Sequence, residues 1–171
     1  RRGDLGRLRL QLLGTDPVLG LAGEASDLGL QGQGGIGKTV LATALVRDLV
    51  NTPAADLGPA GLQAAAEALG TEFEATMHVT KGHELEVGYP MIHAVGQAAE
   101  KHRAPRLIEL VWGNPKHPRV AVIGKGVAFD TGGLNIKTGP YMRLMKKDMG
   151  GAAHALALAR LVMEARLPVH L

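Results

Sequence analysis

Apolar residues recur along the chain with two different spacings, and this pattern predicts strands and helices in turn. Apolar positions that alternate or form short continuous runs predict strands at residues 7–12, 73–79, 106–112 and 119–123. Apolar positions that recur every three or four residues predict helices at residues 40–50, 60–69, 83–87, 91–99 and 150–165. Pro53 stops the first of these helices and Gly70 caps the second.

The alternation of strands and helices predicts the fold class. We expect a three-layer α/β domain, in which a mostly parallel sheet carries helices on both faces. The first 31 residues are rich in glycine, leucine and arginine, and apart from the alternation at residues 7–12 their periodicity is weak. We therefore expect them to form a poorly ordered leader.

Composition narrows the class of protein further. Hydrophobic residues make up 46% of the 171 residues and charged residues 20%, which is typical of a globular domain. Only five residues are aromatic (one Trp, two Tyr and two Phe), so we expect an aliphatic core and no base-stacking nucleic-acid surface. The net charge of +3 is mild and adds no sign of a nucleic-acid partner.

The absence of cysteine excludes disulfides and thiolate metal sites, and it fits a reducing compartment. No apolar run is long enough to cross a bilayer, and no signal-peptide pattern opens the sequence. We therefore expect a cytoplasmic protein with no membrane partner.

Residues 32–39, GQGGIGKT, match the phosphate-binding loop pattern of nucleotide-binding proteins. Gly32 and Gly37 would let backbone N–H groups surround phosphates, Lys38 would reach the β and γ oxygens, and Thr39 would hold Mg²⁺. Residues 28–47 resemble the loop of regulatory NTPases on this basis. The residues before the loop form a poor buried strand, however, and no second acidic strand follows. A nucleotide-binding module is therefore kept as the alternative function.

A second polar group follows the apolar run at residues 119–123. Lys125, Asp130, Lys137 and Asp148 lie within one glycine-rich stretch, and in open α/β sheets ligands bind beyond the carboxyl ends of the strands. We expect glycines at positions 124 and 126 to break the strand, so that the four side chains turn toward one site. Taken singly, Asp148 could be only a helix N-cap, the lysines solvated charges, and Asp130 part of a turn.

The motifs in this stretch resemble the leucyl (cytosol) aminopeptidase family. They are GKGVAFDTGG at 124–133, IKT at 136–138 and KKDMGGAA at 146–153, and the resemblance covers about residues 44–171. It implies two divalent cations (manganese or zinc, or magnesium) that activate a water to release N-terminal residues from peptides. It also implies metal ligation by Lys125, Asp130 and Asp148, polarisation of the substrate carbonyl by Lys137, and a homo-oligomer, a hexamer in the family.

The ligand roles are physically reasonable. Two cations about 4 Å apart need several hard oxygen ligands. Lys125 could ligate only as a neutral amine, and adjacent divalent cations favour loss of its proton.

The sequence also departs from the family. The later Asn-Thr-Asp-Ala-Glu-Gly-Arg motif, which supplies further ligands, does not occur in these 171 residues. We therefore expect a leader with a phosphate-loop-like sequence at 1–43 and a partial, truncated catalytic domain at 44–171, weakly active or inactive. A chimeric or truncated reading frame, or a non-catalytic remnant that folds by association, would explain the same features.

Overall fold

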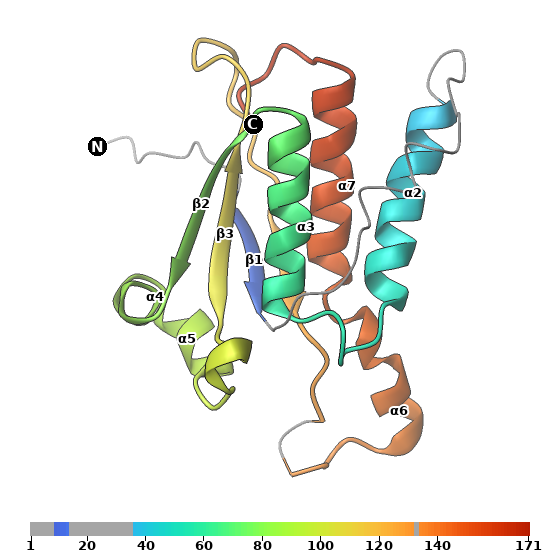
Figure 1. The fold of residues 1–171 in the computed structure, drawn as a ribbon, viewed down its shortest axis with the longest axis vertical. Helices are drawn as coiled ribbons and strands as arrows, with labels where there is room; N and C mark the ends of the chain where they lie inside the picture. Colours follow the sequence, from blue (N-terminus) through green and yellow to red (C-terminus); the bar gives the residue numbers. More distant parts are fainter. Residues whose placement is uncertain (1–8, 14–35, 132–133) are drawn as a thin grey trace.

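The computed structural model describes residues 9–13, 36–131 and 134–171. They form an open, mixed four-stranded sheet in the order β2-β3-β1-β4, packed against helices (Figure 1). The strands are β1 (Arg9–Leu13), β2 (Thr76–Lys81), β3 (Arg106–Val111) and β4 (Gly124–Val127). The helices are α2 (Ile36–Asn51), α3 (Pro59–Glu72), α4 (His83–Gly88), α5 (Pro90–Gly96), α6 (Gly139–Arg143) and α7 (Gly150–Glu164), with short 3₁₀ turns η1 (Lys101–Arg103) and η2 (Leu144–Lys147).

The α/β class and the helices on both faces of the sheet are confirmed. β3 is buried on both faces, because its side chains point alternately to two hydrophobic clusters. Ile108 and Leu110 pack in the larger cluster with α3 and α7, whereas Leu107 packs with Leu85 of α4 and Ile92 of α5. The larger cluster consists of Leu, Ile, Ala and Met side chains, so the core is aliphatic as expected.

The strand directions differ from the expectation of a mostly parallel sheet. β1 runs parallel to β4, but β3 is antiparallel to both β1 and β2. The reason is visible in Figure 1, where the chain leaves β2 into α4 and α5 at the lower end of the sheet and re-enters β3 at that same end. A connection that does not return along the sheet leaves neighbouring strands antiparallel.

Two expected strands are shifted along the chain. α3 continues to Glu72 and Glu74 adopts a positive φ of 55°, so β2 begins at Thr76 rather than at 73. The apolar run at 119–123 forms only an isolated bridge, between Arg119 and His170, and the strand is instead Gly124–Val127. The glycines expected to break the strand therefore lie within it.

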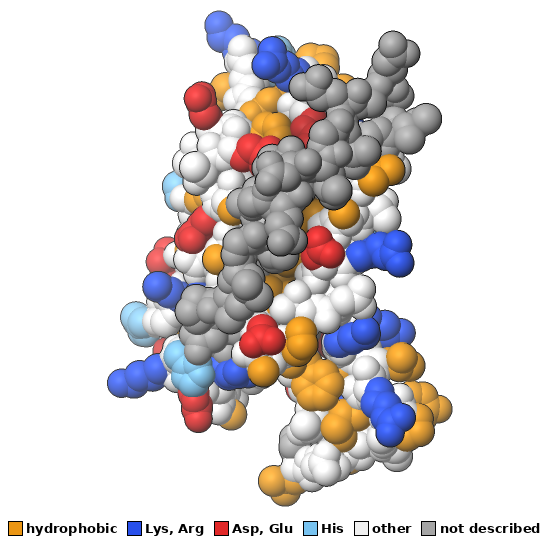
Figure 2. Space-filling view, turned by 45° about the vertical axis from the view of Figure 1, so that its right-hand side comes forward, with side chains coloured by type: hydrophobic (Ala, Val, Ile, Leu, Met, Phe, Trp, Pro, Cys, Tyr) orange, Lys and Arg blue, Asp and Glu red, His pale blue; other side chains and the backbone are white. Residues whose placement is uncertain are grey.

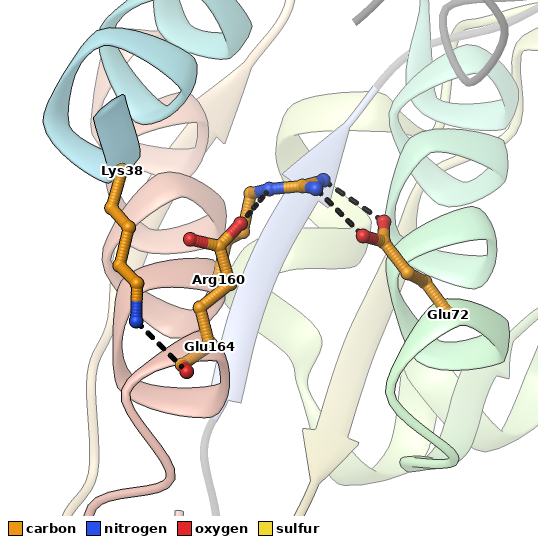
Figure 3. A network of polar contacts seen from close by, with 4 residues as sticks. All are labelled: Lys38, Glu72, Arg160 and Glu164. Atoms are coloured by element: carbon orange, nitrogen blue, oxygen red, sulfur yellow. Dashed lines mark hydrogen bonds and ion pairs between the residues drawn. The ribbon is translucent and has the colours of Figure 1, made fainter. Parts of the chain in front are cut away.

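Three helices are joined by a polar network centred on Arg160 of α7 (Figure 3). Its guanidinium donates two hydrogen bonds to the carboxylate of Glu72 at the end of α3, at 2.6 and 2.9 Å, and a third to Glu164 at 2.7 Å. The guanidinium also lies 5.7 Å from the centre of the Phe73 ring. The Arg160 side chain is only 20% exposed, whereas that of Glu72 is 47% exposed, so the bidentate pair that joins α3 to α7 is partly open to water.

The segment between β4 and α7 projects from the lower end of the molecule as an arm that carries α6 (Figure 1). Figure 2 shows hydrophobic side chains gathered on this projection. Leu134 is 96% exposed, and Ile136, Tyr141 and Leu144 are also exposed. The arm therefore presents apolar side chains without burying them against the rest of the described structure.

Candidate functional site

The candidate site is built where β4 meets the start of α7. Gly124 and Gly126 are buried and Lys125 between them is exposed, as the alternation along a strand requires. A Cβ atom on Gly124 would lie 2.5 Å from the carbonyl oxygen of Gly151 and 2.6 Å from Cα of Ala152. A Cβ on Gly151 would lie 2.9 Å from the backbone nitrogen of Lys125. The absence of side chains at both positions thus allows the first turn of α7 to contact β4.

This contact brings Lys125 to Asp148, which precedes α7. The Lys125 ammonium donates to the carboxylate Oδ1 of Asp148 at 2.9 Å and to its backbone oxygen at 2.6 Å. The Asp148 side chain is 29% exposed and that of Lys125 56%. Asp148 is not the N-cap of α7, because that position belongs to Met149 and no side chain caps the helix. The carboxylate is therefore left to interact with groups outside the helix.

A second ion pair forms at the base of the arm. Lys137 Nζ lies 2.8 Å from Oδ1 of Asp130, and the Lys137 backbone N–H donates to the carbonyl of Thr131 at 3.0 Å. Both side chains are partly exposed. The four residues singled out in the sequence thus form two lysine–aspartate pairs. Lys125–Asp148 joins the two ends of the segment between β4 and α7, and Asp130–Lys137 lies within the first part of that segment.

The donor set determines which ligands the site could hold. Within the described part of the chain, no group of three or more His, Cys, Asp or Glu side chains is placed to hold a metal ion. Asp130 and Asp148 each offer carboxylate oxygens, and Lys125 would add a nitrogen once neutral. These are hard donors that suit Mg²⁺, Mn²⁺ or Zn²⁺, but they are fewer than two such cations require. They fit part of a coordination shell.

A pocket of about 220 Å³ lies next to Asp130, between α5, η1 and the end of β4. Its lining is mostly apolar, with Arg103 and Asp130 as its charged residues. Such a pocket suits a small apolar group with a polar end. The sequence did not reveal it, because its walls come from residues 54–58, 95–105 and 127–130, which no local pattern connects. Val95, Arg103 and Phe129 are among the contributors that the sequence analysis missed.

The phosphate-loop residues are placed differently from the expectation. Gly32 lies outside the described residues, and Gly37, Lys38 and Thr39 belong to helix α2. Lys38 Nζ donates to the backbone oxygen of Glu164 at the end of α7, at 3.1 Å (Figure 3). A lysine at the end of a neighbouring helix offsets the partial negative charge of its last carbonyls. In this structure Lys38 therefore contributes to helix packing.

Comparison with known proteins adds a consistent set of similarities. Residues 44–171 match the family model described as the cytosol aminopeptidase family, catalytic domain. A probable cytosol aminopeptidase of Rhodococcus erythropolis is 42% identical over 132 residues, which cover 75% of this chain and 26% of that protein. The chain therefore spans about a quarter of the length of the curated relatives it matches.

Solved structures agree with this match. The crystal structure of cytosol aminopeptidase from Coxiella burnetii is 51% identical, with a TM-score of 0.72 over 78% of this chain and 30% of that one. The bottromycin maturation enzyme BotP in complex with Mn is 36% identical, with a TM-score of 0.69 over 78% of this chain and 29% of that one. None of these similarities supports the alternative function of a nucleotide-binding loop.

Proposed function

The chain belongs to the cytosol aminopeptidase family, and we propose that it contributes to a metal-dependent peptidase that removes N-terminal residues from peptides. The observation that carries this proposal is the junction of β4 with α7. There, the close contact of Gly124 with Gly151 sets Lys125 against Asp148 within the span that matches the family's catalytic domain. The Asp148 carboxylate does not cap α7 and is partly open to solvent, so a ligand could reach it.

The metal ligands in this proposal are Lys125, Asp130 and Asp148. Each carboxylate is already within 3 Å of a cationic group, which shows that its position favours positive charge. Two divalent cations bound there would supply Lewis-acid activation of the peptide carbonyl and of water. We place manganese first among the candidates, because a similar solved protein is in complex with Mn; zinc and magnesium are the others.

Lys137 has the other role, that of orienting substrate. Its side chain is 28% exposed and is held by Asp130, so its ammonium is positioned and yet accessible. An ammonium in this position can donate a hydrogen bond to a peptide carbonyl oxygen as negative charge develops on it. The adjacent pocket of about 220 Å³ is large enough for one apolar side chain of a peptide.

The remaining assignments follow from the family. We propose peptides as substrates, a homo-oligomer as the working form, and residues 44–171 as part of the catalytic domain. The expectation of a separate leader at 1–43 is not proposed again, because Arg9–Leu13 pairs with β3 and β4 within the sheet. The names of the relatives specify the cytosol, and we propose the cytoplasm for this protein as well. Within the described residues, no helix has both the length and the apolar character needed to cross a bilayer.

Metal binding by the full chain tests the proposal most directly. We would titrate Mn²⁺ and follow the free ion by electron paramagnetic resonance, in the wild-type protein and in Asp130→Asn and Asp148→Asn. Each substitution keeps the size of the side chain but removes its charge, so each should weaken binding by at least about tenfold. Glu84→Gln is the matched control, because Glu84 is an exposed carboxylate on α4.

Hydrolysis of a leucyl anilide in the presence of Mn²⁺ is the second measurement. The described carboxylates are fewer than two cations need, so we expect turnover by this chain to be slow or absent even when Mn²⁺ binds. Turnover that a chelator and Asp148→Asn both abolish would support the full proposal. Mn²⁺ binding that neither aspartate substitution changes would contradict it.

A further inference from the structure

The sheet has one strand position between β3 and β4, which we call the row. Two separate segments of the chain lie in this row and run in the same direction. β1 fills one part, parallel to β4 and antiparallel to β3. The residues at the end of the chain fill another part. Leu171 exchanges two backbone hydrogen bonds with Trp112, just beyond β3, and His170 pairs in parallel with Arg119.

The registers show that these two segments belong to one continuous row. Along β3, Leu171 lies opposite Trp112 and Arg9 opposite Glu109, so two row positions, opposite Val111 and Leu110, separate them. Along the other neighbour, His170 lies opposite Arg119 and Leu10 opposite Gly124. Counting along that side also leaves two positions between Leu171 and Arg9, so the two independent registers agree.

This row is enclosed on four sides. β3 and β4 lie on its two edges, while α3 and α7 contact β1 from one face and α5 contacts it from the other. Without a strand in the row, the inner edges of β3 and β4 would leave backbone N–H and C=O groups unpaired inside the protein. A strand that enters pairs along both edges, whereas a peptide added to an open sheet edge pairs along one.

In the sequence, 22 residues (14–35) separate this strand from α2. We propose that the row between β3 and β4 is an acceptor site for one extended peptide strand, which Arg9–Leu13 fills in this chain and which an added peptide of the same sequence can fill in its place. The added peptide competes with Arg9–Leu13 of the same chain, which already pairs along both edges of the row. The occupant passes beside the candidate site, because Gln11 is the register partner of Lys125.

The chain has no cysteine, so an engineered cysteine pair reports on one contact alone. Register partners on neighbouring strands have Cα atoms about 5 Å apart, within the range that a disulfide spans. Gln11→Cys with Lys125→Cys should therefore form a disulfide under mild oxidation. Gln11→Cys with Lys116→Cys is the control, because Lys116 lies in the turn beyond β3, and this pair should not form one.

The same double variant then tests exchange. A fluorescent peptide of residues 7–13 should bind the reduced protein, as measured by anisotropy, and should bind the oxidised protein at least tenfold more weakly, because the disulfide locks Arg9–Leu13 in the row. A peptide with proline at the position of Gln11 should not bind, since proline lacks the N–H that the row pairs. Equal cross-linking of the two cysteine pairs, equal peptide binding by the two redox forms, or no binding by the reduced form would each overturn the proposal.

Discussion

The contact between β4 and α7 makes one sharp prediction, for the substitution Gly124→Ala. The new Cβ would lie 2.5 Å from the Gly151 oxygen, 2.6 Å from the Ala152 Cα and 2.8 Å from the Ala155 Cβ. Two of these atoms belong to the backbone of α7, so the clash cannot be relieved by a change of rotamer. Overpacking of this kind costs about 1–3 kcal/mol. The helix start, and Asp148 with it, must move away from Lys125.

Urea denaturation followed by circular dichroism measures this cost. With a slope of about 1–3 kcal/mol/M, the midpoint should fall by roughly 1 M. Gly88→Ala is the matched control, because nothing lies within 4 Å of its added Cβ and its φ is not in the left-handed region. Its midpoint should stay the same or rise slightly, since alanine favours helix. A Gly124→Ala protein as stable as the wild type would refute the close approach of α7 to β4.

Two further substitutions distinguish a residue proposed to bind metal from a residue that stabilises the fold. Lys125→Met should change the free energy of unfolding by less than about 1 kcal/mol, because the ion pair is half exposed. The same variant should weaken Mn²⁺ binding at least tenfold in the paramagnetic resonance titration, and unchanged affinity would remove Lys125 from the proposed ligands. Arg160→Met should destabilise the protein by about 1–3 kcal/mol in urea, because it leaves the Glu164 carboxylate, 13% exposed, without its partner. The exposed Arg143→Met on α6 is its control, and an equal midpoint for the two variants would show that the network of Figure 3 contributes nothing.

The sequence predicted the elements of the fold better than their arrangement. Helices α2, α3 and α7 were expected close to where they lie, because their apolar residues recur at helical spacing. The expected cap at Gly70 was wrong, since α3 continues to Glu72. The direction of β3 was not predictable, since a period of two residues is the same for either direction. It depends on α4 and α5 lying at the end of β2 instead of returning along the sheet, which is a tertiary property.

The candidate site shows the same division. Lys125, Asp130, Lys137 and Asp148 were singled out by residue type and spacing, and the structure pairs them. The position of β4 was wrong by several residues, because glycines at 124 and 126 indicate a break when the helix that packs on them is unknown. The partner of each lysine, and the wall that Val95, Arg103 and Phe129 give to the pocket, depend on contacts between distant segments. Those contacts have no local signal.

The arm between β4 and α7 should tolerate insertions and deletions. Non-covalent contacts close its base: the Lys125–Asp148 pair and the contact of Gly124 with Gly151 hold the two ends of the arm together, and the Lys137–Asp130 pair closes its first part. Doubling the length of a flexible loop adds only about 0.6 kcal/mol of closure entropy. Insertions and deletions beyond Lys137, around α6, should therefore leave both aspartates where they are. The arm tip is a natural place to graft a reporter or to open new chain ends by circular permutation.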